Sequence, residues 1–159
     1  MALKYLENRG INQDSVNQFN LGVYSKNGSQ WIAIPHYQGD NLVNIKFRSL
    51  PPADNTFRRI PDCKSILFNV DALHGKDEII ITEGEIDAIT LLQAGIDNVI
   101  GATNGAGAFD AEWVDQLKPI KKSILSMTQI KLAGRDLGQL QSDLDIADAT
   151  ISCCRTARA

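Results

Sequence analysis

One stretch decides the fold of this chain: Ile79-Ile80-Ile81-Thr82-Glu83-Gly84-Glu85-Ile86-Asp87-Ala88-Ile89-Thr90-Leu91-Leu92. Its first residues form a short, β-branched apolar run, which predicts a buried strand. Its last five residues are mostly apolar and predict a helix. Glu83 falls at the carboxyl end of the strand, where open α/β sheets bind their ligands. Gly84 is expected to let the backbone turn sharply there.

The acids of this stretch form a candidate metal and catalytic site. Asp87 follows Glu83 by four residues, so both carboxylates can face the same side of the strand-to-helix turn. Hard divalent cations such as Mg²⁺ bind through a few carboxylates and keep several waters. The alternative is that acids in the first turn of a helix complement its dipole. On spacing alone, this simpler explanation is the better one.

Composition indicates one globular domain or two small ones, because the 159 residues are 43% hydrophobic and 22% charged. No apolar run is long enough to span a membrane. The N-terminus is no signal peptide, since Glu7 interrupts its short apolar part. Cys63, Cys153 and Cys154 have neither zinc-site nor disulfide spacing. A reducing cytoplasm is therefore expected, with no membrane partner.

The net charge of −3 conceals an uneven distribution. Residues 1–76 hold nine Lys or Arg against six Asp or Glu, whereas residues 77–122 hold three against nine. A basic part followed by an acidic part suits a phosphate-binding surface beside a metal-binding one. Two solvated faces without a function would give the same counts, and the counts alone favour that alternative.

The segment before the central stretch predicts a small mixed subdomain. Two short helices are expected within residues 3–19, with Asn12 or Asp14 capping the second. Two strands are expected at residues 31–35 and 42–48, because β-branched and aromatic residues there flank a turn-forming cluster. Together with the later strand and helix, this order of elements predicts an α/β (α+β) fold.

Alternation along the second of these strands divides its side chains between two faces. Lys46 and Arg48 share one face, which we expect to be exposed. Val43, Ile45 and Phe47 share the other, which we expect to face the core. The two cations should therefore lie side by side on the surface.

More cations follow a Pro-rich break in the chain. Arg58, Arg59 and Lys64 come shortly after it, with Phe57 beside them. With the two cations of the preceding strand, they are expected to form one basic surface for a single strand or for nucleotide phosphates. The alternative is an ordinary charged edge strand, which prevents aggregation. Spacing alone does not separate the two.

A second strand–loop unit follows the central helix. Residues 98–102 predict an apolar strand, and the strand–helix–strand order implies a right-handed parallel crossover. The small-residue loop at residues 103–108 then lies at the same sheet edge as Glu83. Its backbone N–H groups, at Asn104 and Gly105 among others, can approach a nucleotide phosphate closely. A tight turn without a ligand is the alternative.

Three of these pieces together resemble the primase portion of phage primase-helicases, Twinkle-type proteins and DnaG-type primases. They are Val43-Asn44-Ile45-Lys46-Phe47-Arg48-Ser49, the Asn104-Gly105-Ala106 loop and Glu83-Gly84-Glu85-Ile86-Asp87, which resembles the first motif of the TOPRIM metal-binding fold. The resemblance implies a primase subdomain with a basic face at residues 1–76, and the first half of a TOPRIM parallel sheet at residues 77–122.

The resemblance also implies a reaction. The family makes RNA primers on single-stranded DNA from ribonucleoside triphosphates, with Mg²⁺ or Mn²⁺ and beside a replicative helicase, in a bacterial or phage-infected cell. Glu83 would serve metal binding or acid–base catalysis, with Asp87 as its helical partner. Lys46 and Arg48 would contact template or nucleotide phosphates. The metal would neutralise triphosphate charge and activate the attacking hydroxyl.

The chain departs from the family where a second acidic motif, Asp-x-Asp-x-x-Gly, should follow the next strand. Residues 123–134 hold no acid, and residues 123–159 contain no Phe, Trp, Tyr or Pro. A shifted reading frame permits the missing motif at this place, although only its first Asp, from Met127 and Thr128, is forced. We therefore expect a truncation or frameshift after about Lys122, the alternative being a divergent authentic tail. The family's N-terminal zinc module is also missing from this sequence.

These residues and the resemblance leave two main functions open. The first is a DNA primase lineage with little or no primer synthesis in this chain, because two of four expected carboxylates are missing. The alternative is a non-catalytic module that binds single-stranded nucleic acid through Lys46, Arg48, Arg58 and Arg59. A TOPRIM nuclease is a third candidate, and the basic strand argues against it.

Overall fold

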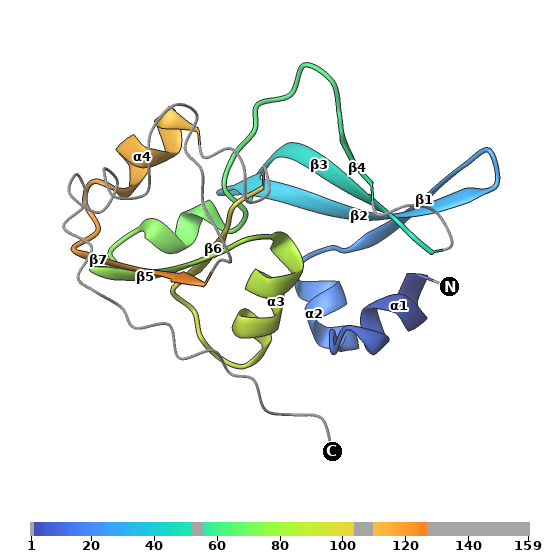
Figure 1. The fold of residues 1–159 in the computed structure, drawn as a ribbon, viewed down its shortest axis with the longest axis horizontal. Coiled ribbons are helices and arrows are strands. Elements are labelled where there is room, and N and C mark those ends of the chain that lie inside the picture. Colours follow the sequence, from blue (N-terminus) through green and yellow to red (C-terminus); the bar gives the residue numbers. More distant parts are fainter. Residues whose placement is uncertain (1, 52–55, 104–109, 127–159) are drawn as a thin grey trace.

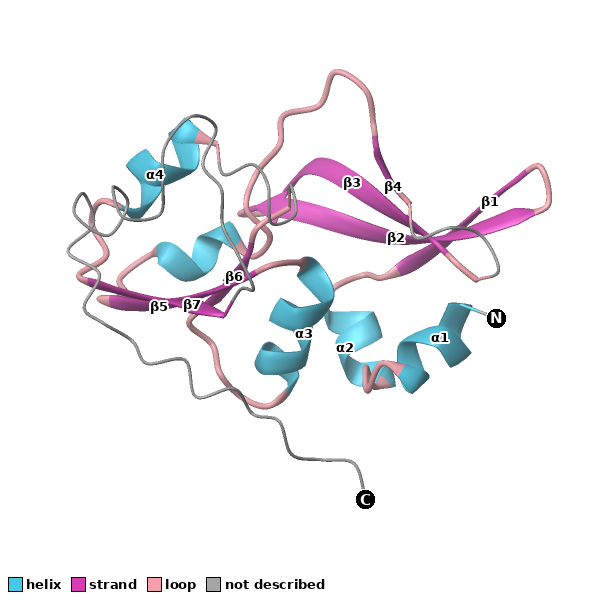
Figure 2. Ribbon diagram, in the orientation of Figure 1, coloured by secondary structure: helices cyan, strands magenta, loops and turns pink. Residues whose placement is uncertain are grey.

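Two sheets of different kinds divide the chain between them. The computed structural model describes residues 2–51, 56–103 and 110–126. An antiparallel sheet, sheet A, has the strand order β1-β2-β3-β4, and a parallel sheet, sheet B, has the order β6-β5-β7. Helix α3 lies between the two sheets, while α1 and α2 lie below sheet A in the view of Figure 1. The predicted mixed α/β fold is confirmed (Figure 2).

The elements have the following bounds: α1 Ala2–Asn8, α2 Gln13–Gln18, β1 Gly22–Lys26, β2 Ser29–Gln38, β3 Asn41–Ser49, β4 Phe57–Arg59, the 3-10 helix η1 Val70–Leu73, β5 Glu78–Thr82, α3 Glu85–Gln93, β6 Val99–Gly101, α4 Ala111–Leu117 and β7 Lys122–Ser126.

The N-terminal helical pair is attached to the rest of the chain by hydrogen bonds. Asn12 caps α2, because its side-chain oxygen accepts from the Ser15 amide at 2.8 Å. Gln93, the last residue of α3, accepts from the Asn12 amide at 2.8 Å and donates to the Gly10 carbonyl at 2.8 Å. Of the two predicted caps, the structure therefore uses Asn12, and the same residue fixes the pair against α3.

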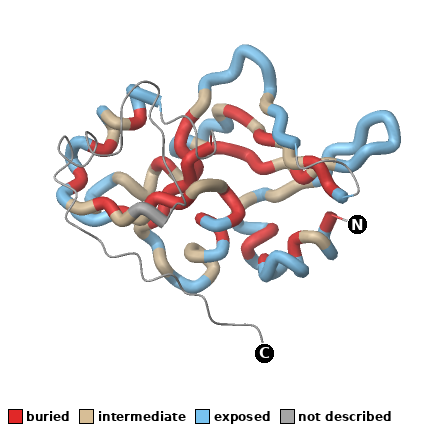
Figure 3. The backbone as a smooth tube through the Cα atoms, viewed as in Figure 1, coloured by how far each residue is buried: buried red, intermediate tan, exposed pale blue. Residues whose placement is uncertain are grey.

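Sheet A turns its basic strand inward, contrary to the sequence prediction. In the antiparallel pairing, Lys46 of β3 lies opposite Ile34 of β2. Ile34 belongs to the core that packs against the helices, so its face is the covered one. Lys46 is only 6% exposed as a result. Figure 3 shows buried stretches in red where sheet A passes over the helices, and exposed stretches in pale blue at the β1–β2 hairpin. The residues predicted to face the core, such as Phe47, are half-buried on the other face.

Sheet B is a short parallel sheet with β5 in the middle. Its apolar residues Ile79 and Ile81 pack with Trp113 and Leu117 of α4, which cover one side. Helix α3 joins β5 to β6, which are parallel, as predicted. Strand β7 pairs with β5 and runs through the boundary predicted after Lys122. The frameshift prediction concerns residues 123–159, and all of these except 123–126 of β7 lie outside the described residues.

No helix in residues 2–51, 56–103 or 110–126 is long and apolar enough to cross a membrane.

Near the β5–α3 turn, the position that requires glycine is Gly101 of β6, not Gly84. The chain turns from β5 into α3 at Gly84, but with a φ of −155°, an extended conformation open to any residue, so the turn does not need the conformational freedom expected of glycine. A Cβ on Gly101 of β6, however, would lie 3.2 Å from the Gly84 carbonyl oxygen and 3.3 Å from the Phe68 Cβ. Gly101 thus allows β6 to pass close to the backbone that follows Glu83.

We expect Gly101→Ala to destabilise the fold by about 1–3 kcal/mol, because an added methyl group would push on backbone rather than on a movable side chain. Urea unfolding followed by circular dichroism measures this. Gly22→Ala is the matched control, since its Cβ would have Ala33 Cβ at 3.8 Å and no closer neighbour. Equal stabilities of the two variants would show that β6 can move away from Gly84 without cost.

Candidate functional site

A pocket of about 530 Å³ opens where sheet A meets the amino end of α3. Cations line it from the turn after α1 and from β3 and β4, and carboxylates line it from the β5–α3 turn. Six of the predicted site residues border it: Lys46, Arg48, Arg58, Arg59, Glu83 and Asp87. The two predicted loop residues, Asn104 and Gly105, lie outside the described residues.

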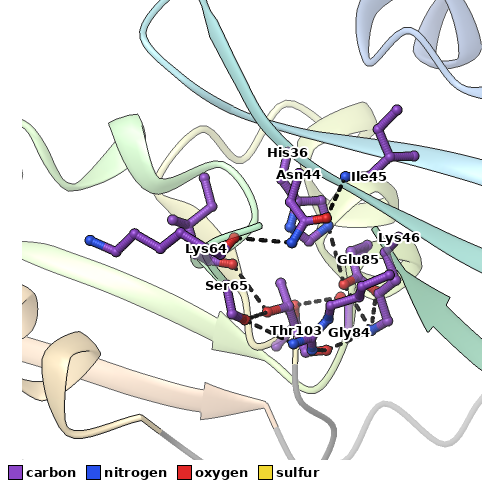
Figure 4. Close-up of polar contacts among 12 residues, drawn as sticks. His36, Asn44, Ile45, Lys46, Lys64, Ser65, Gly84, Glu85 and Thr103 are labelled. Carbon is purple, nitrogen blue, oxygen red and sulfur yellow. Dashed lines mark hydrogen bonds and ion pairs between the residues drawn. The ribbon is translucent and has the colours of Figure 1, made fainter. Parts of the chain in front are cut away.

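A buried ion pair forms the base of this pocket. The Lys46 Nζ donates to both Glu85 carboxylate oxygens, at 2.9 and 3.0 Å, and to the Thr103 carbonyl at 2.8 Å (Figure 4). Glu85 is only 3% exposed. The ammonium therefore has three protein acceptors for its three protons. These contacts join β3 of sheet A to α3 and to the end of β6.

The surroundings keep Glu85 ionised. Burial alone would raise the pKa of its carboxyl group, but the neighbouring His36 imidazole and Lys46 ammonium outweigh burial and hold it below the usual value. Burial also lowers the pKa of Lys46, against the opposing attraction of Glu85. His36 Nε2 lies 3.4 Å from Glu85 Oε1 and has no hydrogen-bond partner among the described residues.

Thr103 fixes a second cation at the pocket. Its carbonyl accepts from Arg59 Nη2 as well as from Lys46, and its hydroxyl donates to the Ile66 carbonyl at 3.0 Å. Arg59 Nη1 also donates to the Ser65 hydroxyl at 3.0 Å. Arg59 is thereby oriented by two groups at the end of β6 and in the β4–η1 connection.

Arg48 is a half-buried cation of the pocket and lies beside two aromatic rings. Its guanidinium carbon lies 5.3 Å from the Phe57 ring centroid and 5.6 Å from that of Tyr5. Its Nε has no hydrogen-bond partner in the described part of the chain. Phe57 is 46% exposed, and Lys46 Nζ lies 4.6 Å from its centroid. The aromatic ring is thus exposed among cations, an arrangement suited to a base with its phosphate.

The predicted basic surface is divided by the fold. Arg58 stacks on Trp31, with 4.9 Å between the guanidinium carbon and the ring centroid. The register pairs Arg58 with Phe47, on the face of sheet A opposite Lys46. Lys64 forms an exposed ion pair with Glu112 and does not line the pocket. The pocket's cations are therefore those of β3 and β4 together with Arg9 of the turn after α1.

The carboxylates available for a metal are Glu83 and Asp87. Glu83 is half-buried and Asp87 exposed, and both border the pocket. The Thr82 hydroxyl donates to the Gly84 carbonyl at 3.0 Å and fixes the turn between them. No group of three His, Cys, Asp or Glu that could hold a metal occurs among the described residues. Two carboxylates suit a Mg²⁺ ion that keeps waters and takes other ligands from substrate phosphates.

Sequence reasoning missed Glu85 and Arg9, and it placed Thr103 in the predicted loop without giving it a role of its own. Glu85 stands between the two predicted acids, but nothing in the sequence pairs it with a lysine 39 residues away. Arg9 and Thr103 enter only through the packing of distant elements. The one available signal was the second Glu of the Glu-Gly-Glu motif, to which sequence reasoning gave no role of its own.

The chain has distant relatives among characterised primase-like sequences. Over 77 residues, 48% of this chain, it is 35% identical to the Twinkle homolog protein, chloroplastic/mitochondrial, of Arabidopsis thaliana, of which it covers 10%. Over 75 residues, 47% of this chain, it is 35% identical to the Primase homolog protein of the same plant, of which it covers 21%. The chain thus spans less than a quarter of either relative. No family model matches it.

Solved primases share its fold. The primase fragment of the bacteriophage T7 primase-helicase matches with a TM-score of 0.58 at 22% identity, over 87% of this chain and 57% of that one. The RNA polymerase domain of Mycobacterium tuberculosis primase DnaG, in complex with a double-stranded DNA oligomer with a 6-nucleotide overhang, matches with a TM-score of 0.62 at 14% identity, over 78% and 55%.

A further T7 structure holds primase domains bound to an RNA/DNA hybrid and dTTP, and matches with a TM-score of 0.58 at 22% identity, over 80% of this chain and 63% of that one. The resemblance to DnaG-type and phage primases found in the sequence is confirmed by these folds and by the two plant relatives.

Replacing one partner of the Lys46–Glu85 ion pair should lower the free energy of unfolding more than replacing both. We expect Lys46→Met alone to destabilise the chain by about 3–5 kcal/mol, because Glu85 would be left buried and uncompensated. Lys46→Met combined with Glu85→Leu should recover part of this loss. Urea unfolding in a double-mutant cycle measures the coupling.

The matched control is Lys64→Met with Glu112→Leu, because both side chains of this pair are more than half exposed. Its coupling should be about 0–1 kcal/mol. A Lys46–Glu85 coupling no larger than that of the control would contradict the structural role given to the buried pair.

Acid should weaken the fold through Glu85. The pKa of the Glu85 carboxyl group is lower in the folded chain than its ordinary value of 4.5. Ionised Glu85 therefore stabilises the fold fully above pH 4.5, and this stabilisation is lost as the pH falls through the folded pKa. We expect the unfolding free energy of the natural chain to fall more steeply below about pH 4.5 than that of Glu85→Gln. Urea titrations at several pH values measure both slopes, and parallel slopes would show that Glu85 is not the responsible group.

Proposed function

We propose that this chain, which has a primase fold and distant primase-like relatives, is a primase-like domain of DNA replication whose pocket binds nucleoside triphosphates and single-stranded DNA template. The observation that carries the proposal is the meeting of cations from β3 and β4 with two carboxylates of the β5–α3 turn in one pocket. The DNA and nucleotide complexes of the similar M. tuberculosis and T7 domains support the choice of ligand.

The arginines supply phosphate recognition in this proposal. Arg48 and Arg59 carry planar guanidinium groups, which bind phosphate oxygens in pairs. Both have contacts that restrict them, Arg48 with the rings of Tyr5 and Phe57 and Arg59 with Thr103 and Ser65. Less conformational freedom is then lost on binding. Phe57 offers its ring to a base, and Lys46 adds charge from beneath while remaining bound to Glu85.

Glu83 and Asp87 are the residues that would hold Mg²⁺ or Mn²⁺. Such an ion supplies charge neutralisation at the triphosphate. Glu85 is excluded from this role because its oxygens are occupied by Lys46. The half-buried Glu83 lies closer to the strand end and is the better candidate to hold a proton or a metal beside the reacting phosphate, and Asp87 lies one helical turn away.

We expect primer synthesis by this chain to be weak or absent. The described residues offer two carboxylates for metal, whereas phosphoryl-transfer sites that use two metals need more ligands. The alternative function is then binding of single-stranded nucleic acid without catalysis. A replicative helicase partner and a location in a bacterial or phage-infected cell rest on the sequence resemblance alone.

Calorimetric titration with ATP and Mg²⁺ tests the proposal. We expect Arg48→Gln to weaken triphosphate binding about tenfold or more, because a charge-assisted contact is lost. Glu83→Gln should remove most of the difference between titrations with and without Mg²⁺. Lys118→Gln is the control, since Lys118 is exposed and paired with Asp115 away from the pocket.

Primer synthesis is measured separately, by separating labelled oligoribonucleotides made on a single-stranded template. Robust template-dependent products that survive Glu83→Gln would contradict the assignment of the site. Triphosphate binding that is equal in all variants would contradict the pocket as the nucleotide site.

A further inference from the structure

The face of sheet A that points away from the pocket carries aromatic side chains where a half-buried sheet usually carries polar ones. The register places Tyr24 opposite Trp31, and Ala33 opposite Phe47, so the three rings share one face. The rings of Tyr24 and Phe47 contact each other, with centroids 5.1 Å apart. Tyr24 is 42% exposed, and Trp31 and Phe47 are half-buried. We call this set the outer aromatic face.

The charge around the outer aromatic face is positive. Arg58 lies on it, paired in register with Phe47 and stacked on Trp31. Lys26 lies on it too, because it follows Tyr24 by two residues in the same strand. The four strands β1 to β4 contain no Asp or Glu at all. A partner for this face should therefore be rich in negative charge and in flat rings.

Single-stranded nucleic acid has both properties. Bases stack on exposed aromatic rings and phosphates pair with the neighbouring cations, largely without regard to sequence. A protein partner would also value the aromatic rings, but a sheet face with cations and no carboxylate favours a polyanion over a surface of mixed charge.

The outer aromatic face is continuous with the pocket across the edge strand β4. Residues along β4 alternate between the two sides: Phe57 pairs with Arg48, and Arg59 with Lys46, on the pocket side, whereas Arg58 pairs with Phe47 on the outer side. Arg58 also borders the pocket. A single-stranded nucleic acid that leaves the pocket can therefore cross β4 beside Arg58 and reach the rings of the outer aromatic face.

We propose that the outer aromatic face is a second binding surface for single-stranded nucleic acid, with bases stacked on Tyr24, Trp31 and Phe47 and phosphates paired with Arg58 and Lys26. This surface extends the template site of the proposed function over the edge of sheet A. The path of the nucleic acid from the pocket to this surface rests on the proposed function. Binding at this surface needs neither metal nor triphosphate.

The two tryptophans of the chain allow a direct test. Trp31 lies on the outer aromatic face, whereas Trp113 is only 1% exposed in the core beside α4. Titration with oligodeoxythymidylate in the absence of metal should quench the emission of the natural chain. The Trp31→Phe variant should lose this quenching, because only Trp113 remains. Equal fractional quenching in both chains would overturn the proposal.

Affinity is measured on the same oligonucleotide by fluorescence anisotropy at several salt concentrations. Tyr24→Leu should weaken binding about fivefold or more through lost stacking, and Arg58→Gln should reduce the salt slope by about one. Val23→Ser is the matched control for Tyr24→Leu, because Val23 is 52% exposed on the opposite face of the same strand. Circular dichroism verifies that each variant is folded.

The remaining outcomes separate this proposal from the pocket's function. Loss of oligonucleotide binding with Arg48→Gln, but not with Tyr24→Leu or Trp31→Phe, would confine the strand to the pocket and overturn the second surface. Metal-free quenching of Trp31 in a chain that binds no triphosphate would support the second surface and contradict the nucleotide pocket. Self-association that Tyr24→Leu abolishes, without any effect on the oligonucleotide, would assign the face to a protein partner and overturn the proposal.

Discussion

The ion pair between Lys46 and Glu85 is the contact on which the rest of the site depends. It joins a strand of the antiparallel sheet to the first residue of the helix that leaves the parallel sheet. Both groups are withdrawn from water, so each is tolerable only in the presence of the other. The relative placement of the two sheets at the pocket is thereby fixed by charge as well as by apolar packing.

The Lys46–Glu85 pair gives the charged residues of the pocket different roles. Lys46 and Glu85 satisfy each other, which leaves the arginines that line the pocket as the cations for a ligand, and Glu83 and Asp87 as the acids. Lys46, Arg48 and Arg59 share one face of sheet A, so their neighbours make the division: Lys46 meets Glu85, whereas Arg48 lies beside the ring of Phe57. The basic strand and the acidic turn thus provide both the buried ion pair at the bottom of the pocket and the charged side chains around it that can contact a ligand.

Local rules recovered most elements of the fold, and tertiary packing decided what they missed. The strand and helix around Glu83 were predictable from β-branched and helix-periodic residues, as was the capping role of Asn12. The exposure of Lys46 was predicted wrongly because alternation defines two faces without saying which one the helices cover. The role of Gly101 was invisible for a similar reason, since its close neighbour is the backbone of Gly84. The pocket needs contacts between segments far apart in the chain.

Paramagnetic line broadening by Mn²⁺ in the NMR spectrum of the chain, with a nucleoside triphosphate present, tests the metal and nucleotide site most directly. If the pocket holds both ligands, amide signals broaden first at Glu83 and Asp87, then at Arg48 and Arg59 across the pocket. Broadening centred instead on exposed acids outside the pocket, such as Asp97, would contradict this assignment. The triphosphate and the metal would then bind elsewhere, and the meeting of cations and carboxylates in the pocket would have a structural role only.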